Sequence, residues 1–142
     1  MTTTTETKSL KLAIVAALAL GTPLEGGTYH GIYTQKDGTQ VAIVRLADKP
    51  SGRMTHAEAT AWAESVGGVL PSRVAGAILY ANAKDQFEPT WYWTCESLDA
   101  DTGDEDDASY AWLCHFGNGT QGCSSKSAHG AAVAVRLIHL EV

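Results

Sequence analysis

Residues 109–138 limit most strongly what this chain can fold into. Three aromatic side chains stand between positions 110 and 116, and the following run, residues 117–130, contains glycine and mainly small or polar residues, with no large aliphatic side chain. Residues 131–138 are predicted to form a strand that anchors the segment in the core. Because the middle run can scarcely bury itself, we expect it on the surface. Small hydroxyl, amide and glycine positions beside rigid aromatics are typical of adaptable protein-binding loops, although composition alone favours an ordinary Gly/Ser-rich loop.

Length, composition and charge indicate a single globular domain. The chain has 142 residues and a mass of 15.0 kDa, which is long enough to bury a core. Its 44% hydrophobic and 18% charged residues are typical of a folded protein and not of a disordered one. The formal charge of −6 and the scattered Lys and Arg residues argue against a protein that tracks nucleic-acid phosphates, so we expect no nucleic-acid partner.

An N-terminal segment, residues 1–25, is predicted to stand apart from a domain at residues 26–142. Residues 1–7 are polar and rich in threonine, and residues 8–20 are apolar on almost every side. We expect no membrane span, because that run is too short to cross a bilayer. The preferred interpretation is a buried apolar helix whose residues 10–20 serve self-association or docking on a carrier. A secretory signal with Ala17-Leu18-Ala19 as its cleavage site is the alternative.

Local signals predict a hairpin and the first of two helices. Residues 26–46 alternate like two strands joined by the turn Lys36-Asp37-Gly38. Thr55 and Glu58 have the spacing of a capping box, and Gly67-Gly68 predicts the end of the helix that they start.

The second helix is predicted over about residues 73–84, with Ser72 as its cap, and a short aromatic strand follows at residues 91–94. Apolar residues at helical spacing indicate the face of this helix that packs in the core, and that face consists of Val74, Ala77, Ile78 and Ala81.

Residues 96–107 are acidic, with seven Asp and Glu among twelve residues. Asp99, Asp101 and Asp104 could offer oxygens to calcium, but the spacing misses an EF-hand, since Gly103 stands at its fifth position and Tyr110 at the position of the bidentate Glu. We therefore prefer a solvated loop and expect no cofactor, with a weak calcium site as the alternative.

Three cysteines, Cys95, Cys114 and Cys123, form no CxxC pair and no cluster at zinc spacing. They are expected to be free thiols in a reduced protein, although the sequence leaves open a bond between Cys114 and Cys123. Signatures of hydrolases and nucleotide-binding loops are absent from the sequence, so a non-catalytic protein is expected.

Taken in order, several short motifs resemble the DUF1566 family of bacterial and phage proteins. They are Leu70-Pro71-Ser72-Arg73, Leu79-Tyr80-Ala81-Asn82, residues 87–94, residues 110–119 and residues 132–136. The resemblance implies a C-type lectin-like α+β fold, in which two helices pack on antiparallel strands. Some family members are the hypervariable proteins of diversity-generating retroelements, whose C-terminal surface recognises a ligand. A protein or glycan on a target surface, with display on a phage virion or a bacterial surface, is then the expected setting.

In those retroelements the adenines of a template copy are randomised, so that Asn codons yield a restricted set of residues. Residues of that set are candidates for variable ligand contacts: Tyr110, Leu113, Cys114, His115, Thr120, Gly122, Cys123, Ser124, Ser125, Ser127 and Ala128. Gln121 and Lys126 lie outside the set and are expected to be framework. Trp91, Trp93, Trp112 and Phe116 are expected to form a rigid aromatic scaffold in the core or at its rim.

Two other functions share this general fold. A calcium-dependent carbohydrate-binding module is the first, but Thr90 follows Glu88-Pro89 where such lectins carry Asn. A formylglycine-generating type of enzyme is the remote second, with Cys114 and Cys123 as its only candidate thiols and His115 as the only neighbour able to lower a thiol pKa.

Overall fold

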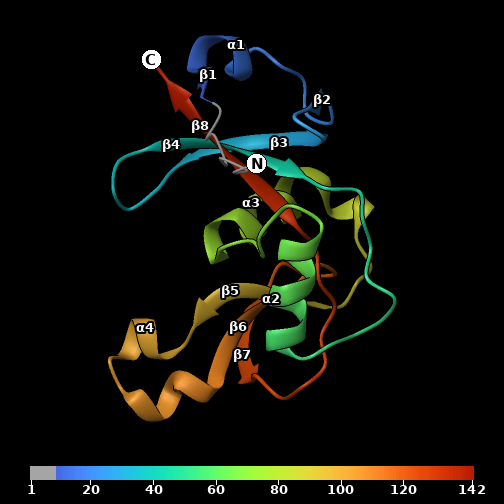
Figure 1. Ribbon diagram of the computed structural model, residues 1–142, viewed down its shortest axis with the longest axis vertical. Helices are drawn as coiled ribbons and strands as arrows, with labels where there is room; N and C mark the ends of the chain where they lie inside the picture. Colours follow the sequence, from blue (N-terminus) through green and yellow to red (C-terminus); the bar gives the residue numbers. More distant parts are fainter. Residues whose placement is uncertain (1–8) are drawn as a thin grey trace, which may run out of the picture.

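The computed structural model describes residues 9–142 (Figure 1). The fold is mixed α+β, with a five-stranded sheet in the order β1-β8-β4-β3-β2 and a three-stranded sheet in the order β5-β6-β7. The elements are β1 Leu10–Lys11, α1 Leu12–Ala16, β2 Pro23–Leu24, β3 Gly27–Thr34, β4 Gln40–Arg45, α2 His56–Ser65, α3 Arg73–Ala83, η1 Lys84–Gln86, β5 Trp91–Ser97, α4 Asp99–Thr102, η2 Glu105–Ser109, β6 Tyr110–His115, β7 Gln121–Ser125 and β8 Val135–Glu141. The polar start predicted for residues 1–7 lies outside the described residues.

The predicted hairpin is confirmed and forms the centre of the larger sheet. β3 and β4 are antiparallel neighbours, and β8 adds to the other side of β4 with Val41 opposite His139. Val41, Ala42, Ile43 and Val44 are all buried, because β4 is covered on both faces. The sheet therefore holds the last residue of β4, Arg45, between two paired strands.

The predicted caps of both long helices are also confirmed. At α2, Thr55 and Glu58 form both hydrogen bonds of the capping box, and at α3 the Ser72 hydroxyl accepts from the amide of Ala75. The chain leaves α2 at Gly67, whose φ of 85° is a left-handed conformation that favours glycine. α3 lies between the two sheets and contacts β3 on one side and β5 and β6 on the other (Figure 1).

The prediction of the buried face of α3 is wrong at three of its four residues, since only Ile78 packs partly buried against the core. Val74, Ala77 and Ala81 are exposed, and the buried face consists of Ala75, Gly76, Leu79 and Ala83. Small residues face the core because β6 approaches α3 so closely that a Cβ atom on Gly76 would lie 2.5 Å from the Cys114 sulfur. The helical spacing in the sequence is correct, but residues such as Val74, chosen by that spacing and their apolar side chains, lie on the exposed face.

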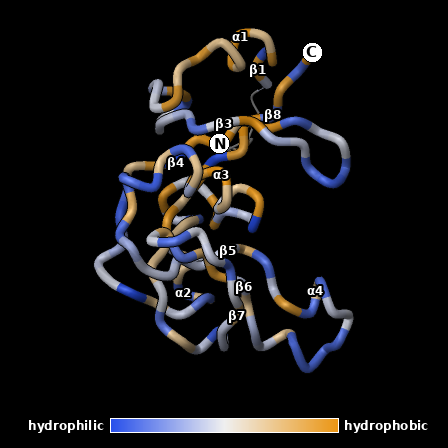
Figure 2. The backbone as a smooth tube through the Cα atoms, turned by 180° about the vertical axis from the view of Figure 1, so that it is seen from behind, coloured by the Kyte–Doolittle hydropathy of each residue, from blue (hydrophilic) through white to orange (hydrophobic). Residues whose placement is uncertain are grey.

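The predicted N-terminal helix is much shorter than expected. Only Leu12–Ala16 of this segment is helical, and Leu10 and Lys11 before it pair in parallel with the end of β8. Val15 is buried against Tyr29 and Leu140 of the same chain. The apolar segment therefore packs on its own domain, at the opposite end of the molecule from the hydrophilic stretch around α4 (Figure 2). None of the helices within residues 9–142 is long and apolar enough to cross a membrane.

The last third of the chain corrects two further expectations. Residues 117–130 are not a loop throughout, since they contain β7, and the final strand begins at Val135 and not at residue 131. Residues 131–134 instead cross from one sheet to the other. Ala131 bonds to the backbone of Trp91 and Trp93 in β5, and the Ala134 carbonyl accepts from Leu46 just after β4. This crossing ties the two sheets together.

Candidate functional site

The three-stranded sheet carries nearly all of the predicted site residues. In its register Trp93, Leu113 and Gly122 form one row across the strands, and Tyr92, Cys114 and Gln121 form the next. Neighbouring rows project to opposite faces, because side chains alternate along a strand. The first row packs toward α2 and the second toward α3, so the two faces of the sheet have different surroundings.

A hollow of about 280 Å³ opens on the face directed toward α2. We call it the tryptophan hollow, and its lining residues are Trp91, Trp93, Leu113, Gly122, Cys123, Ser124, Ala128 and His129. Five of these eight are among the residues expected to vary. Two tryptophans with small polar residues around them can hold a flat or apolar group and offer hydrogen bonds at its edge.

Trp93 forms the fixed wall of the hollow. Its side chain is fully buried, and its Nε1 donates to the Met54 carbonyl at 2.8 Å. The His56 ring meets it edge to face at 5.2 Å between centroids. A Cβ atom on Gly130 would lie 3.0 Å from Nε1, so the backbone packs directly on the indole. Trp93 is therefore held on several sides and belongs to the core, as expected.

Trp91 forms the accessible wall. It is 37% exposed and meets His115 edge to face at 5.0 Å. A Cβ atom on Gly122 would lie 3.5 Å from the same ring, an ordinary contact distance. A larger side chain at position 122 would therefore extend along Trp91 and change the shape of the hollow.

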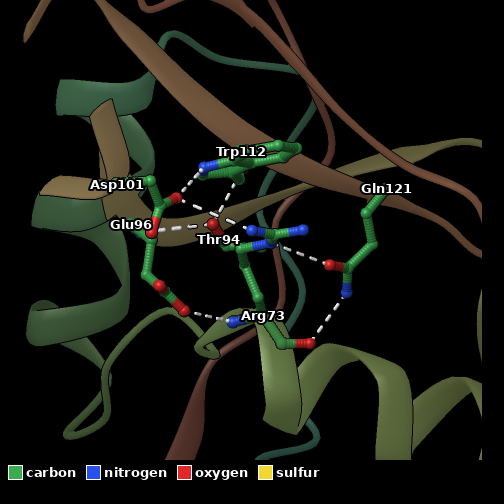
Figure 3. A network of polar contacts seen from close by, with 6 residues as sticks. All are labelled: Arg73, Thr94, Glu96, Asp101, Trp112 and Gln121. Carbon is green, nitrogen blue, oxygen red and sulfur yellow. Dashed lines mark hydrogen bonds and ion pairs between the residues drawn. The ribbon is translucent and has the colours of Figure 1, made fainter. Parts of the chain in front are cut away.

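The opposite face of the sheet carries a network centred on Arg73, the first residue of α3 (Figure 3). Its guanidinium carbon lies 3.6 Å from the centroid of the Trp112 ring, and Trp112 Nε1 donates to Asp101 at 2.7 Å. Arg73 Nε donates to the Gln121 carbonyl oxygen at 3.0 Å, and the Gln121 amide donates back to the Arg73 carbonyl at 2.7 Å.

This network joins α3, β6, β7 and α4 at the rim of the candidate surface. The Arg73–Asp101 pair, at 3.6 Å, is about one-third exposed on both side chains, so its charge attraction contributes little by itself. The stacking on Trp112 and the paired hydrogen bonds of Gln121 fix the geometry. Gln121, expected to be framework, thus connects the edge strand to the helix.

The remaining predicted contact residues divide by exposure. Tyr110, Thr120, Cys123 and Ser127 are exposed, and His115, Gly122, Ser124, Ser125 and Ala128 are partly exposed. Leu113 and Cys114 are only 6% and 4% exposed, so their assignment to an open contact surface is corrected. Leu113 packs in the core beside Trp93 and reaches only the floor of the hollow. Cys114 points toward α3.

Of the scaffold aromatics, Trp93 and Phe116 are buried, Trp112 is partly buried and Trp91 is at the surface. Sequence reasoning did not assign His129 and Arg73 to the site. His129 lies within residues 117–130, directly after the variable candidate Ala128, and that neighbourhood is the signal that the sequence offers. Nothing local places Arg73 over Trp112, since the two residues are brought together by packing of α3 on β6.

The three cysteines are free and lack the features of catalytic thiols. Burial raises the pKa of the Cys114 thiol to about 11, and it also raises the pKa values of Cys95 and Cys123. A reactive thiol needs the opposite shift, toward the thiolate at neutral pH. The arrangement therefore gives no support to the formylglycine-generating type of chemistry.

The acidic stretch folds into α4 and η2 and is not a plain loop. Asp101 is engaged with Trp112 and Arg73, and the Asp104 carboxylate accepts from the amide of Asp106 at the start of η2. Across residues 9–142, no three His, Cys, Asp or Glu side chains gather as a metal site. The candidate set Asp99, Asp101 and Asp104 is thus not brought together around a shared position.

Comparisons with known proteins give no family for this chain. No family model matches it, and neither does any curated protein.

Proposed function

We propose that this chain is a non-catalytic ligand-binding protein with a C-type lectin-like fold, and that a diversity-generating retroelement varies its binding surface. Its motifs resemble those of the DUF1566 family, in the order given above. Two capped helices packed on antiparallel strands are compatible with such a fold. The ligand is a protein or glycan on a target surface.

The tryptophan hollow is the observation that carries this proposal. Five of its eight lining residues are among the positions expected to vary, and they line the hollow together with a tryptophan that is fixed in the core. Affinity in such a site comes from a few rigid aromatic anchors, and specificity comes from the polar positions around them. Substitution at the exposed positions then changes the ligand without changing the fold.

The encoding locus tests the retroelement directly. We expect a reverse-transcriptase gene nearby and a near-copy of the segment that encodes the C-terminal region, differing only at adenines. Because Leu113 and Cys114 are buried, the differences should fall on codons of accessible positions such as Gly122 and Ser124. A locus with neither the near-copy nor the reverse transcriptase would overturn the proposal, since the surface would then be fixed.

A matched pair of substitutions tests whether the surface tolerates variation. Tyrosine, one of the residues that randomisation yields, is placed at Cys123 and at Cys114. Cys123→Tyr is expected to change the free energy of unfolding by less than about 0.5 kcal/mol, because the side chain is exposed. Cys114→Tyr is expected to cost about 3 kcal/mol or to prevent folding, because the thiol already contacts Gly76.

Urea denaturation of both variants and the parent measures the difference. Equal losses at the two positions would contradict the division into a variable surface and a fixed core. The two substitutions start from the same residue and end at the same residue on neighbouring strands, so they differ mainly in burial.

A further inference from the structure

A second cleft, which none of the expected variable residues lines, has a volume of about 460 Å³. Its walls are the segment between β4 and α2, the residues around Phe87 before β5, and the crossing at residues 131–133. The first of these walls follows the right edge of the molecule in Figure 1 and is mostly hydrophilic in Figure 2. We call the whole cleft the Arg45 cleft, because the Arg45 side chain distinguishes it.

Arg45 is held in the cleft without a protein acceptor for its Nε. Its backbone is paired with Thr28 of β3 and Val135 of β8, so the residue is fixed in the sheet. The guanidinium carbon lies 5.8 Å from the centroid of the Phe87 ring. Nε is buried, and within residues 9–142 it has no hydrogen-bond partner. A buried donor without an acceptor is costly, and one in a cleft is available to a ligand.

The Tyr92 hydroxyl adds a second donor. It accepts a hydrogen bond from the Glu88 amide at 3.1 Å, and its own proton remains available to donate. Burial raises the pKa of Tyr92, and the hydrogen bond from the Glu88 amide lowers it; the charge of Glu88 raises this pKa, whereas the charges of Arg53 and Arg45 lower it. The charges of two arginines, one from the sheet and one from the loop before α2, therefore both reach this hydroxyl.

The rest of the lining limits the ligand. Phe87, Val133 and Leu46 provide an apolar wall. Three acidic side chains in the lining, Asp48, Asp85 and Glu88, balance its three basic ones, Arg45, Lys49 and Arg53, so a multiply charged anion gains no net attraction as it enters. A single carboxylate fits the planar guanidinium and the adjacent hydroxyl, and the volume is in the range of small-molecule sites.

We propose that the Arg45 cleft binds a small molecule that carries one carboxylate and an apolar body. The carboxylate lies against Arg45 and Tyr92, and Arg53 supplies further positive charge. The apolar body lies along Phe87. This binding is separate from the tryptophan hollow and does not depend on the function proposed for that surface.

Titration of the full chain with 3-phenylpropanoate, followed by calorimetry and by amide NMR shifts, tests the inference. We expect saturable binding with a dissociation constant on the order of 1 mM or tighter, with the largest shifts at Phe87 and Ala132. 3-Phenylpropanol, which lacks the charge, and inorganic phosphate, which lacks the apolar body, should each bind at least about tenfold more weakly.

Variants then assign the contacts. Arg45→Met should weaken 3-phenylpropanoate binding at least about tenfold, whereas Lys36→Met, in the exposed turn between β3 and β4, should leave it unchanged. Tyr92→Phe removes only the hydroxyl and should weaken binding about fivefold, so it tests the site even if Arg45→Met fails to fold. The proposal is wrong if phenylpropanol or phosphate binds as tightly, if Tyr92→Phe binds normally, or if no binding occurs.

Discussion

Replacing Trp93 by alanine is expected to lower the free energy of unfolding by about 3–5 kcal/mol, as for other buried aromatic residues. The indole is fully buried between α2 and the three-stranded sheet and packs with Leu113 and Ala59. Alanine would leave a cavity that Gly130 cannot fill, and the hydrogen bond to the Met54 carbonyl would be lost. Urea denaturation followed by far-UV circular dichroism measures the change.

Trp91→Ala is the matched control, because Trp91 lies two residues earlier in the same strand and also lines the tryptophan hollow. It is 37% exposed, so its loss is expected to cost only about 1 kcal/mol. Trp93→Phe keeps most of the volume and should fall between the two. Equal destabilisation by Trp91→Ala and Trp93→Ala would contradict the distinction between a core wall and an accessible wall.

Elements with local signals could be predicted from the sequence. The capping box of α2 needs only Thr55 and Glu58, three residues apart, and both of its hydrogen bonds are present. Ser72 likewise caps α3, since its hydroxyl accepts a hydrogen bond from the amide of Ala75, three residues later in the chain. The hairpin was also predicted from local features, namely the alternation of residues along its two strands and the turn at residues 36–38 between them. Such elements depend on interactions within a few residues, and a sequence pattern contains all of them.

Features that depend on packing could not be predicted in this way. The buried face of α3 was wrong at Val74, Ala77 and Ala81 because the sheet comes close enough to need small residues such as Gly76 at the contact, and nothing in the helix itself indicates that distance. β7 was missed because Gly122 and Ser124 have low strand propensity, and pairing with β6 makes the strand. Tertiary pairing overrides local preference at both places.

The candidate site shows the same division. The aromatic and small residues of the C-terminal region could be identified by type, and Trp93 could be assigned to the core. Codon sets, however, do not distinguish Cys114, which is buried, from Cys123, which is exposed. The contact of Arg73 with Trp112 and the position of Arg45 beside Phe87 join residues far apart in the chain, and only the fold brings them together.

Replacing Gly27 by alanine is the second change with a large expected effect, about 3 kcal/mol or more of lost stability. Gly27 begins β3, and a Cβ atom there would overlap the Arg45 carbonyl oxygen and lie 2.7 Å from a methyl carbon of Val44. The obstructing atoms include the backbone of β4, which cannot move without breaking its pairing with β8. The added methyl group should therefore separate the first pairs of β3 and β4, and thermal and urea denaturation would both show the loss.

Substitutions at two other glycines serve as controls, because they show the effect of replacing glycine by alanine without a steric overlap at the Cβ atom. Gly52 has open space around its Cβ position and no positive φ, so Gly52→Ala should change stability by less than about 1 kcal/mol and can even raise it. Gly38 also has open space but a φ of 87°, so Gly38→Ala should cost about 1 kcal/mol from backbone strain alone. If Gly27→Ala lowered the free energy of unfolding as little as Gly52→Ala does, the close approach of β3 to β4 would be contradicted.

Because Arg45 is the strand residue that this approach fixes, Gly27→Ala should also weaken carboxylate binding in the Arg45 cleft, whereas Gly38→Ala should not.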